Sequence, residues 1–193
     1  INAEGGQVLL TGAAAQDVFS RVVNNDGIIK AGRIENQGGI IRLVGTSGAV
    51  SNGGSLDASS TDGQGGDIDV LGDQVTLTGD SRINASGNTG GGNIRIGGDF
   101  QGNNPEIHNA SQTYVESGAE ITANAVTDGN GGKVVIWSDG TTEFNGHISA
   151  QGGMNSGNGG FAEVSGKEHL LLTGYADLTA AHGDAGTLLV DPG

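Results

Sequence analysis

A pair of glycines followed by two alternating apolar positions recurs along the whole chain, and no other feature limits the fold as strongly. Each copy reads Gly-Gly-x-apolar-x-apolar, and most copies begin roughly 27 residues after the previous one. The copies start at Gly5, Gly38, Gly65, Gly91, Gly131 and Gly159, and a weaker one follows at Ala185. A fixed period of this length is typical of a solenoid, in which each repeat buries its apolar residues only against its neighbours.

Two further motifs divide each repeat into three strands. One motif ends in an apolar residue, and the other, of the form aliphatic-x-Ala, follows six residues later in all repeats but one. The first motif ends at Val23, Val50, Leu77, Val115, Phe144 and Leu172; the second begins at Ile29, Leu56, Ile83, Ile121, Ile148 and Leu178. Three short strands per turn predict an all-β fold, a right-handed parallel β-helix of six to seven coils.

The charged residues exclude one class of partner. The 193 residues include 8 Lys and Arg but 22 Asp and Glu, which gives a formal net charge of −14. Nucleic-acid binding needs clustered cations that neutralise phosphates, so we expect no nucleic-acid partner. The chain has no Cys, which excludes disulfides and thiolate metal sites.

Two repeats are longer than the rest, near residues 11–18 and near residues 98–112. Insertions in a solenoid become loops on one side, which is often the binding side. We therefore predict two loops that leave the same corner of the coil. Because the chain opens inside a repeat, we also expect residues 1–193 to be a single solenoid segment of a longer protein.

Four side chains are the candidates for ligand binding. Phe100 and His108 lie in the second insertion, whereas Trp137 and Phe161 lie on the Gly-Gly strands and are predicted to face outward. Outward aromatic rings stack on sugar rings or contact a partner surface. The alternative is structural: Phe100 folds back over the coil, and a loop or flanking segment covers Trp137.

Known catalytic patterns are missing from the sequence. It contains no Gly-x-Ser-x-Gly, no His-Glu-x-x-His and no Walker loop. One outward row of the aliphatic-x-Ala strands is predicted to read Arg82, Glu120, His147, Asp177. Its last three members would suit a metal or acid–base site, but charges that alternate up a stack are also what cross-strand pairing favours. We favour this charge ladder, and expect no catalytic residue, no metal, no cofactor and no enzymatic activity.

Several stretches of the chain are similar to one protein family. They are Gly5–Thr11, Val22–Gly27, Gly131–Thr142, Gly146–Gly153, Gly159–Lys167 and Gly186–Pro192. In these stretches the chain resembles the large, filamentous-haemagglutinin-like exoproteins of two-partner secretion, also called TpsA-type adhesins. The resemblance implies a secreted or surface protein of a Gram-negative bacterium, exported through an outer-membrane transporter partner and folded as a right-handed β-helix.

The resemblance also implies a place for this segment in the parent protein. The family's amino-terminal secretion domain carries Asn-Pro-Asn-type motifs that engage the transporter. Asn103-Asn104-Pro105 comes nearest to such a motif and does not match it. We therefore predict that the segment lies just downstream of the secretion domain, and we carry no transporter-binding residues over to it.

Three functions remain open at this point, in order of preference. The first is a non-enzymatic structural and adhesive rod that presents extended faces for cell, glycan or matrix contact, for example in a biofilm. The second is a self-assembling extracellular fibre, because unpaired strand edges at the ends of a solenoid template further pairing. The third, a polysaccharide-degrading β-helix enzyme, is the least favoured.

Overall fold

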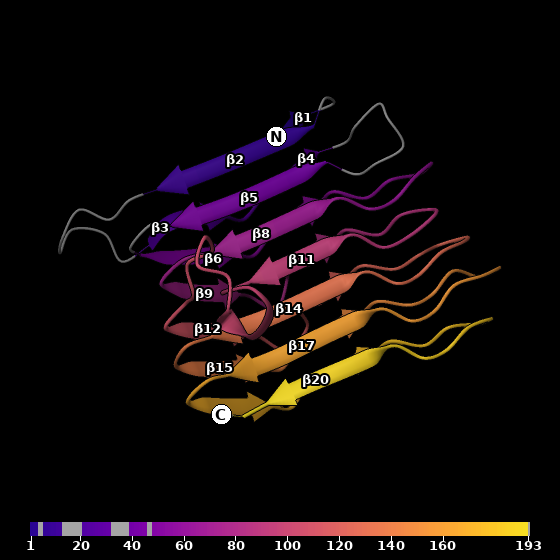
Figure 1. Ribbon diagram of the computed structural model, residues 1–193. Helices are drawn as coiled ribbons and strands as arrows, with labels where there is room; N and C mark the ends of the chain where they lie inside the picture. Colours follow the sequence, from indigo (N-terminus) through magenta and orange to yellow (C-terminus); the bar gives the residue numbers. More distant parts are fainter. Residues whose placement is uncertain (4–5, 13–20, 32–38, 46–47, 193) are drawn as a thin grey trace.

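The computed structural model describes residues 1–3, 6–12, 21–31, 39–45 and 48–192. These residues form a parallel β-solenoid with three sheets, and successive coils stack along one axis (Figure 1). Sheet A has seven strands, sheet B seven and sheet C six, so the chain completes six three-strand coils. The predicted all-β solenoid is confirmed. None of the described residues forms a helix long and apolar enough to cross a membrane.

Each sheet takes one strand from every coil. Sheet A contains β1 (Asn2–Ala3), β4 (Ile28–Ala31), β7 (Ser55–Asp57), β10 (Arg82–Asn84), β13 (Glu120–Thr122), β16 (His147–Ser149) and β19 (Tyr175–Asp177). Sheet B contains β2 (Gln7–Gly12), β5 (Ile40–Gly45), β8 (Asp67–Leu71), β11 (Asn93–Ile96), β14 (Lys133–Ser138), β17 (Phe161–Gly166) and β20 (Thr187–Asp191). Sheet C contains β3 (Arg21–Asn25), β6 (Ala49–Asn52), β9 (Gln74–Leu77), β12 (Gln112–Val115), β15 (Thr141–Phe144) and β18 (His169–Leu172).

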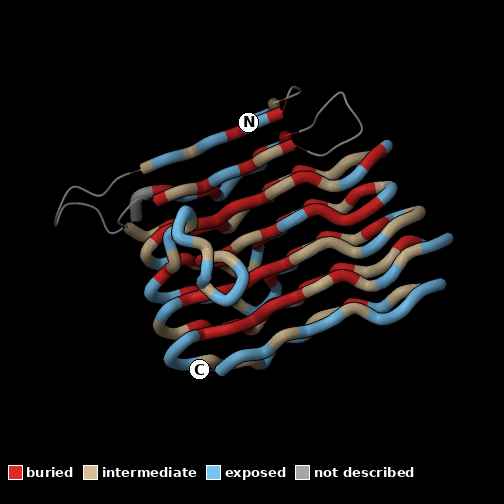
Figure 2. The backbone as a smooth tube through the Cα atoms, viewed as in Figure 1, coloured by how far each residue is buried: buried red, intermediate tan, exposed pale blue. Residues whose placement is uncertain are grey.

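The apolar core runs along the inside of the solenoid as columns of like residues. On sheet B the predicted column is confirmed, with register Val8, Ile41, Ile68, Ile94, Val134, and it continues through Ala162 and Leu188. Its interior members are fully buried, as the red segments in Figure 2 illustrate. Each coil alone would leave these side chains in water, so burial between coils holds the fold together.

The register of sheet C differs from the prediction by two residues in the first coils. Val23 and Val50 stack on Val75, whereas Leu77 stacks on Asn52. Since side chains alternate with period two, a slip of two residues keeps the same side inward and leaves no trace in the apolar pattern. The corner between sheets C and A explains the slip, because coils three and four have two more residues there than the other coils.

Leu77 belongs to a column on sheet C that begins with two buried asparagines, Asn25 in the first coil and Asn52 in the second. Asn25 Nδ2 donates to Asn52 Oδ1 at 2.8 Å, and Asn52 Nδ2 donates to Ser81 Oγ at 2.6 Å. The same amides also donate to the carbonyl oxygens of Gly27 and Gly54. Buried amides are stable only when their hydrogen bonds are satisfied, and here they bridge neighbouring coils at the corner.

Sheet A departs from the prediction in the last coil. Ala176, not Leu178, stacks on Ile148, and Leu178 takes the place held by alanine in the aliphatic-x-Ala motif. Leu178-Thr179-Ala180 matches the aliphatic-x-Ala motif in sequence, but the residue that pairs with Ile148 is Ala176, whose side chain is only a methyl group. The predicted member Leu178 is thus wrong by two residues, although its side chain is still buried at 9% exposure.

In the described coils the chain leaves sheet A, projects outward and returns to sheet B, and the glycine pair lies just before the sheet B strand. The projecting segments of successive coils form a ridge, seen at the right of Figure 1. The second glycine closes the neck of the ridge; for example, Gly132 N–H donates to the Ala123 carbonyl at 2.7 Å. A Cβ on Gly131 would lie 2.1 Å from the Ala150 oxygen, and one on Gly132 would lie 2.1 Å from the Gly92 oxygen. Both glycines are therefore required by the backbone of the adjacent coils.

We expect Gly131→Ala to destabilise the solenoid by about 2 kcal/mol or more, since the added methyl group meets backbone that cannot rotate away. Gly27→Ala is the matched control, because a Cβ there meets only the Asn25 side chain, at 3.8 Å. Urea unfolding of both variants measures the difference. Equal midpoints for the two variants would contradict this account of the glycine pairs.

Candidate ligand-binding face

A loop crosses the outward face of sheet B and makes this the most elaborated surface of the rod. It joins Ile96 of β11 to Gln112 of β12 and contains the short 3-10 helix η1 (Phe100–Gly102). Figure 1 shows it in front of β11 and β14. The structure thus places a loop where the sequence predicts the insertion 98–112. Of the other predicted insertion, 11–18, Thr11 and Gly12 belong to β2 and the rest lies outside the described residues.

Trp137 lies beneath this loop. It follows the inward Ile136 and faces outward as predicted, yet it is only 5% exposed. The loop approaches so closely that a Cβ at Gly98 or Gly102 would come within 2.6 Å of the indole. The indole Nε1 donates to Asp139 Oδ1 at 3.1 Å. The structural alternative, in which a loop covers the ring, is therefore confirmed, and a ligand cannot reach Trp137 while the loop is in place.

Phe100 and Phe161 form an aromatic pair at the edge of the loop. Their rings meet edge to face with centroids 5.7 Å apart. Lys133 Nζ lies 4.8 Å from the Phe100 centroid and 5.9 Å from that of Phe161, in cation–π contact. Phe100 is 37% exposed and Phe161 is half-buried. Two of the four predicted binding residues therefore come together, with a lysine that the sequence analysis did not single out.

His108 lies in a different part of the loop. It borders a groove of about 430 Å³ between the loop and sheet B, which is also lined by Arg42, Leu71 and Ile107. His108 Nε2 is 3.9 Å from Asp73 Oδ1, and the imidazole is well exposed. His108 is therefore separate from the aromatic pair, and the four predicted residues do not form one site.

A buried carboxylate holds the loop in place. Both oxygens of Glu163 accept from the Gln101 backbone N–H, at 3.2 and 3.1 Å, and the Glu163 side chain is fully buried. Gln101 has a φ of 53°, which is unfavourable for a residue with a side chain. Burial raises the pKa of Glu163, against the opposing effect of the Gln101 hydrogen bond. Glu163 lies in the same outward row as Arg42, Asp69 and Arg95, with Val135 between Arg95 and Glu163, and its place in that row was the available signal for it.

Ion pairs tie the start of the loop to sheet B. Asp69, with a side chain only 3% exposed, accepts from Arg42 Nε at 2.9 Å and from Arg95 Nε at 2.7 Å. Arg95 Nη1 in turn lies 3.3 Å from Asp99 Oδ2. The hydrogen bond to Asp69 raises the pKa of Arg95. Burial opposes ionisation of Asp99, but hydrogen bonds from Asn104 and Phe100 outweigh it and lower its pKa. Charges of opposite sign thus alternate from Arg42 through Asp69 to Arg95 up the stack, as cross-strand pairing favours.

The outward row predicted for the aliphatic-x-Ala strands, which form sheet A, is wrong in its last member. Arg82, Glu120 and His147 are in register, but Tyr175 follows them, because the register there is shifted by two residues. Asp177 lies beside Ser149 instead. Arg82 Nε pairs with Glu120 Oε2 at 3.3 Å, and His147 stacks on Tyr175 with centroids 4.2 Å apart. Within the described part of the chain no three His, Asp or Glu side chains are grouped so that they could hold a metal ion.

The chain is similar to a protein of known structure. No family model and no curated protein matches the sequence. Among solved structures, the chain is similar to the HMW1 secretion domain from Haemophilus influenzae, with a TM-score of 0.75 and 28% identity. The match covers 96% of this chain but 47% of that one, so the chain spans about half the length of the solved relative.

We expect Glu163→Gln to stabilise the protein at pH 7, because the amide keeps an acceptor for Gln101 N–H and removes the cost of burying a charge. A raised pKa in the folded state means that the native protein loses stability as the pH rises from the unfolded pKa to the folded one. The gain of the variant should therefore shrink as the pH falls through the raised pKa of Glu163, and should be lost below about pH 4.5, where the carboxyl is protonated in both states.

Chemical unfolding between pH 3 and pH 8 measures this difference in the free energy of unfolding. Glu168→Gln, at an exposed corner, controls for the loss of one negative charge. A gain at Glu163 that is equal at all pH values, or matched by the control, would show that burial of the charge is not its cause.

Proposed function

We propose that this chain is a segment of the β-helical rod of an exoprotein of two-partner secretion, and that the rod serves a structural and adhesive role without catalysis. The observation that carries the proposal is the likeness to a secretion domain across 96% of the chain. The stretches that resemble filamentous-haemagglutinin-like exoproteins, among them Gly131–Thr142 and Gly159–Lys167, support the same conclusion.

The physical character of the solenoid suits export in an unfolded state. Each coil is stabilised by the coil before it, so the rod grows as the chain emerges and needs no distant segment to complete its core. The chain lacks Cys, so its folding outside the cell does not depend on disulfide formation. The partner in this proposal is an outer-membrane transporter, and the location is the extracellular medium or the cell surface.

The position of the segment in its parent protein has two candidates. The mismatch of Asn103-Asn104-Pro105 with the family motif favours a place downstream of the secretion domain. The likeness of nearly the whole chain to a secretion domain favours a place within such a domain. In either case the loop-bearing face of sheet B is the surface offered for cell, glycan or matrix contact.

A self-assembling fibre is the second candidate function, and the last coil favours it. Leu188 and Val190 continue the inward columns of sheet B, yet they are 42% and 40% exposed because no described coil covers them. A further coil, from the same protein or a second copy, would bury them. Light scattering over a hundredfold range of concentration tests the second case: growing particles support a fibre, and a constant monomer mass contradicts it.

We expect export to depend on a two-partner transporter. Two forms of the chain are compared: one carries only a signal peptide, and the other is fused behind a complete secretion domain. Both are produced in a Gram-negative host together with the transporter that exports that secretion domain. Release of the first form supports a place within the secretion domain, and release of the second alone supports a downstream place. If neither is released while the unfused secretion domain is, the proposal fails.

Adhesion is tested separately from export. Beads coated with the purified chain should attach to cell or matrix surfaces several times more often than beads coated with albumin. Attachment equal to that of the albumin beads would contradict the adhesive role and leave the structural role in place.

A further inference from the structure

We propose that a shallow trough on the edge of sheet B binds a neutral, linear polysaccharide that lies along the rod axis. This inference rests on the proposed adhesive function, and it names the ligand class and the place of contact. The trough lies between the loop and the ridge, beside Lys133 and Phe161. None of its residues is Trp137 or His108, so it is distinct from the parts of the surface that those residues occupy.

The trough consists of two depressions that share Asn93 and Lys133. One, of about 370 Å³, lies beside the loop and includes Asp67 and Asp99. The other, of about 480 Å³, extends along the glycine pairs of successive coils. The glycines lack side chains because coil stacking leaves no room for them, which accounts for the hollow floor but supplies no ligand chemistry. That chemistry comes from the two walls.

The first wall is a ladder of amide side chains on the ridge. The residue just before a glycine pair is polar in six of the seven copies, and four of these lie in the described part of the chain: Gln64, Asn130, Asn158 and, before the weaker copy, Asp184. The ladder is ordered by bonds between coils: Asn158 N–H donates to Asn130 Oδ1 at 2.8 Å, and Asp184 N–H donates to Asn158 Oδ1 at 3.0 Å. These side chains are exposed, so they present donors and acceptors to hydroxyl groups in these four coils. In the coil that begins at Gly91 the position is held by Gly90, which has no side chain.

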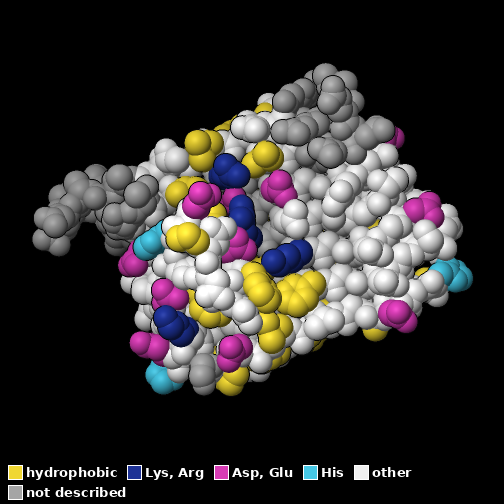
Figure 3. All heavy atoms as spheres, in the orientation of Figure 1, with side chains coloured by type: hydrophobic (Ala, Val, Ile, Leu, Met, Phe, Trp, Pro, Cys, Tyr) yellow, Lys and Arg dark blue, Asp and Glu magenta, His cyan; other side chains and the backbone are white. Residues whose placement is uncertain are grey.

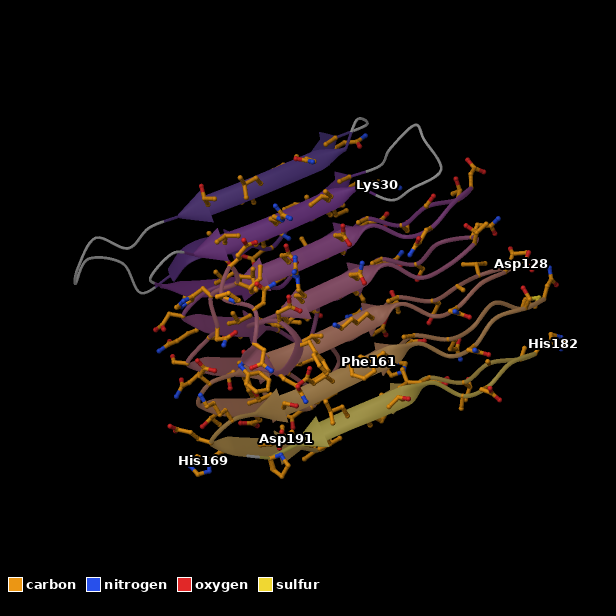
Figure 4. All side chains as sticks on the ribbon, in the orientation of Figure 1. Lys30, Asp128, Phe161, His169, His182 and Asp191 are labelled. Atoms are coloured by element: carbon orange, nitrogen blue, oxygen red, sulfur yellow. The ribbon has the colours of Figure 1, made fainter. Side chains whose placement is uncertain are left out.

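The second wall is the row formed by Asn93, Lys133 and Phe161, with Phe100 contributed by the loop. In Figure 4, Phe161 lies on the open face of sheet B on β17. Figure 3 shows hydrophobic side chains beside a basic one, bordering a broad area of uncoloured surface. Among the described residues, Lys133 has no carboxylate within salt-bridge distance, so its ammonium group is held by the two rings and remains a donor.

The lining selects a sugar over a peptide. A peptide would need an unpaired strand edge or an apolar pocket, but the strands of β11, β14 and β17 are paired on both sides and the floor is bare backbone. An aromatic face with planar amides and an ammonium donor matches a pyranose ring and its hydroxyls. Successive coils are about 4.8 Å apart, and the polar side chains of the ridge recur along them except at Gly90, so the matching ligand is a repeating linear chain.

The charge of the lining selects a neutral sugar over an acidic one. Two cations, Lys133 and Arg95, line the trough against four carboxylates, so the lining is negative overall. The carboxylates are those of Asp67, Asp69, Asp99 and Asp184. The whole chain carries a net charge of −14, so a polyanion would be repelled from this face at moderate salt. Neutral hydroxyl groups avoid that repulsion and still satisfy the amides.

The test is a titration of the purified chain with four hexasaccharides, followed by amide chemical shifts. Cellohexaose, xylohexaose and mannohexaose represent neutral chains, and hexagalacturonate represents acidic ones. We expect at least one neutral sugar to bind and to shift the amides of Gly131 and Gly159. Phe161→Ala should weaken this binding at least tenfold, whereas Tyr175→Ala, an exposed aromatic residue on sheet A, should change it less than twofold.

Lys133→Ala is the second variant, so that the proposal is tested even if Phe161→Ala does not fold; it too should weaken binding. Binding of no neutral sugar, tighter binding of hexagalacturonate, or binding of the peptide (Ser-Val)4 in the trough in place of any sugar would each overturn the inference. Export and bead attachment are measured independently of sugar binding. A negative titration would therefore overturn the polysaccharide site without contradicting the proposed rod function.

Discussion

Direct contact between the backbones of successive coils, at the glycine pairs, is the constraint on which the rest of the structure depends. At Gly131 and Gly132 the neighbouring carbonyl oxygens lie where a side chain would begin. This contact keeps the coils close enough for hydrogen bonding along all three sheets and for burial of the aliphatic columns. Among the described pair glycines only Gly6 has a positive φ, so close approach and not left-handed backbone is the general reason for the motif.

A second set of interactions turns one face of a uniform rod into a distinct surface. The loop between β11 and β12 is held by Glu163 at its 3-10 helix and by the Asp69–Arg95–Asp99 ion pairs at its start. Buried, multiply bonded charges hold a loop in one position because each bond lost would leave a charge unpaired in a low dielectric. The result is a covered Trp137 and an open edge that carries Lys133 and Phe161.

In two places the residues that stack on one another differ from those expected from the sequence. The columns of sheet C and the end of sheet A were each displaced by two residues, at Leu77 and at Leu178. Such an error is invisible in the sequence, because residues two apart face the same side and both are apolar. For the same reason the row Glu120, His147, Asp177 looked like a chemical site, although Tyr175 takes the third place.

The sequence by itself determined the architecture: a repeat near 27 residues, three strands per turn, an aliphatic interior and a loop at 98–112, because these follow from local periodicity and from glycine's lack of a side chain. Only the tertiary structure decided which residues meet across coils. The number of residues at each corner sets the register, and the path of one loop decides that Trp137 is buried while Phe100 meets Phe161 and Lys133. Those outcomes depend on distances between residues far apart in the chain, which periodicity does not encode.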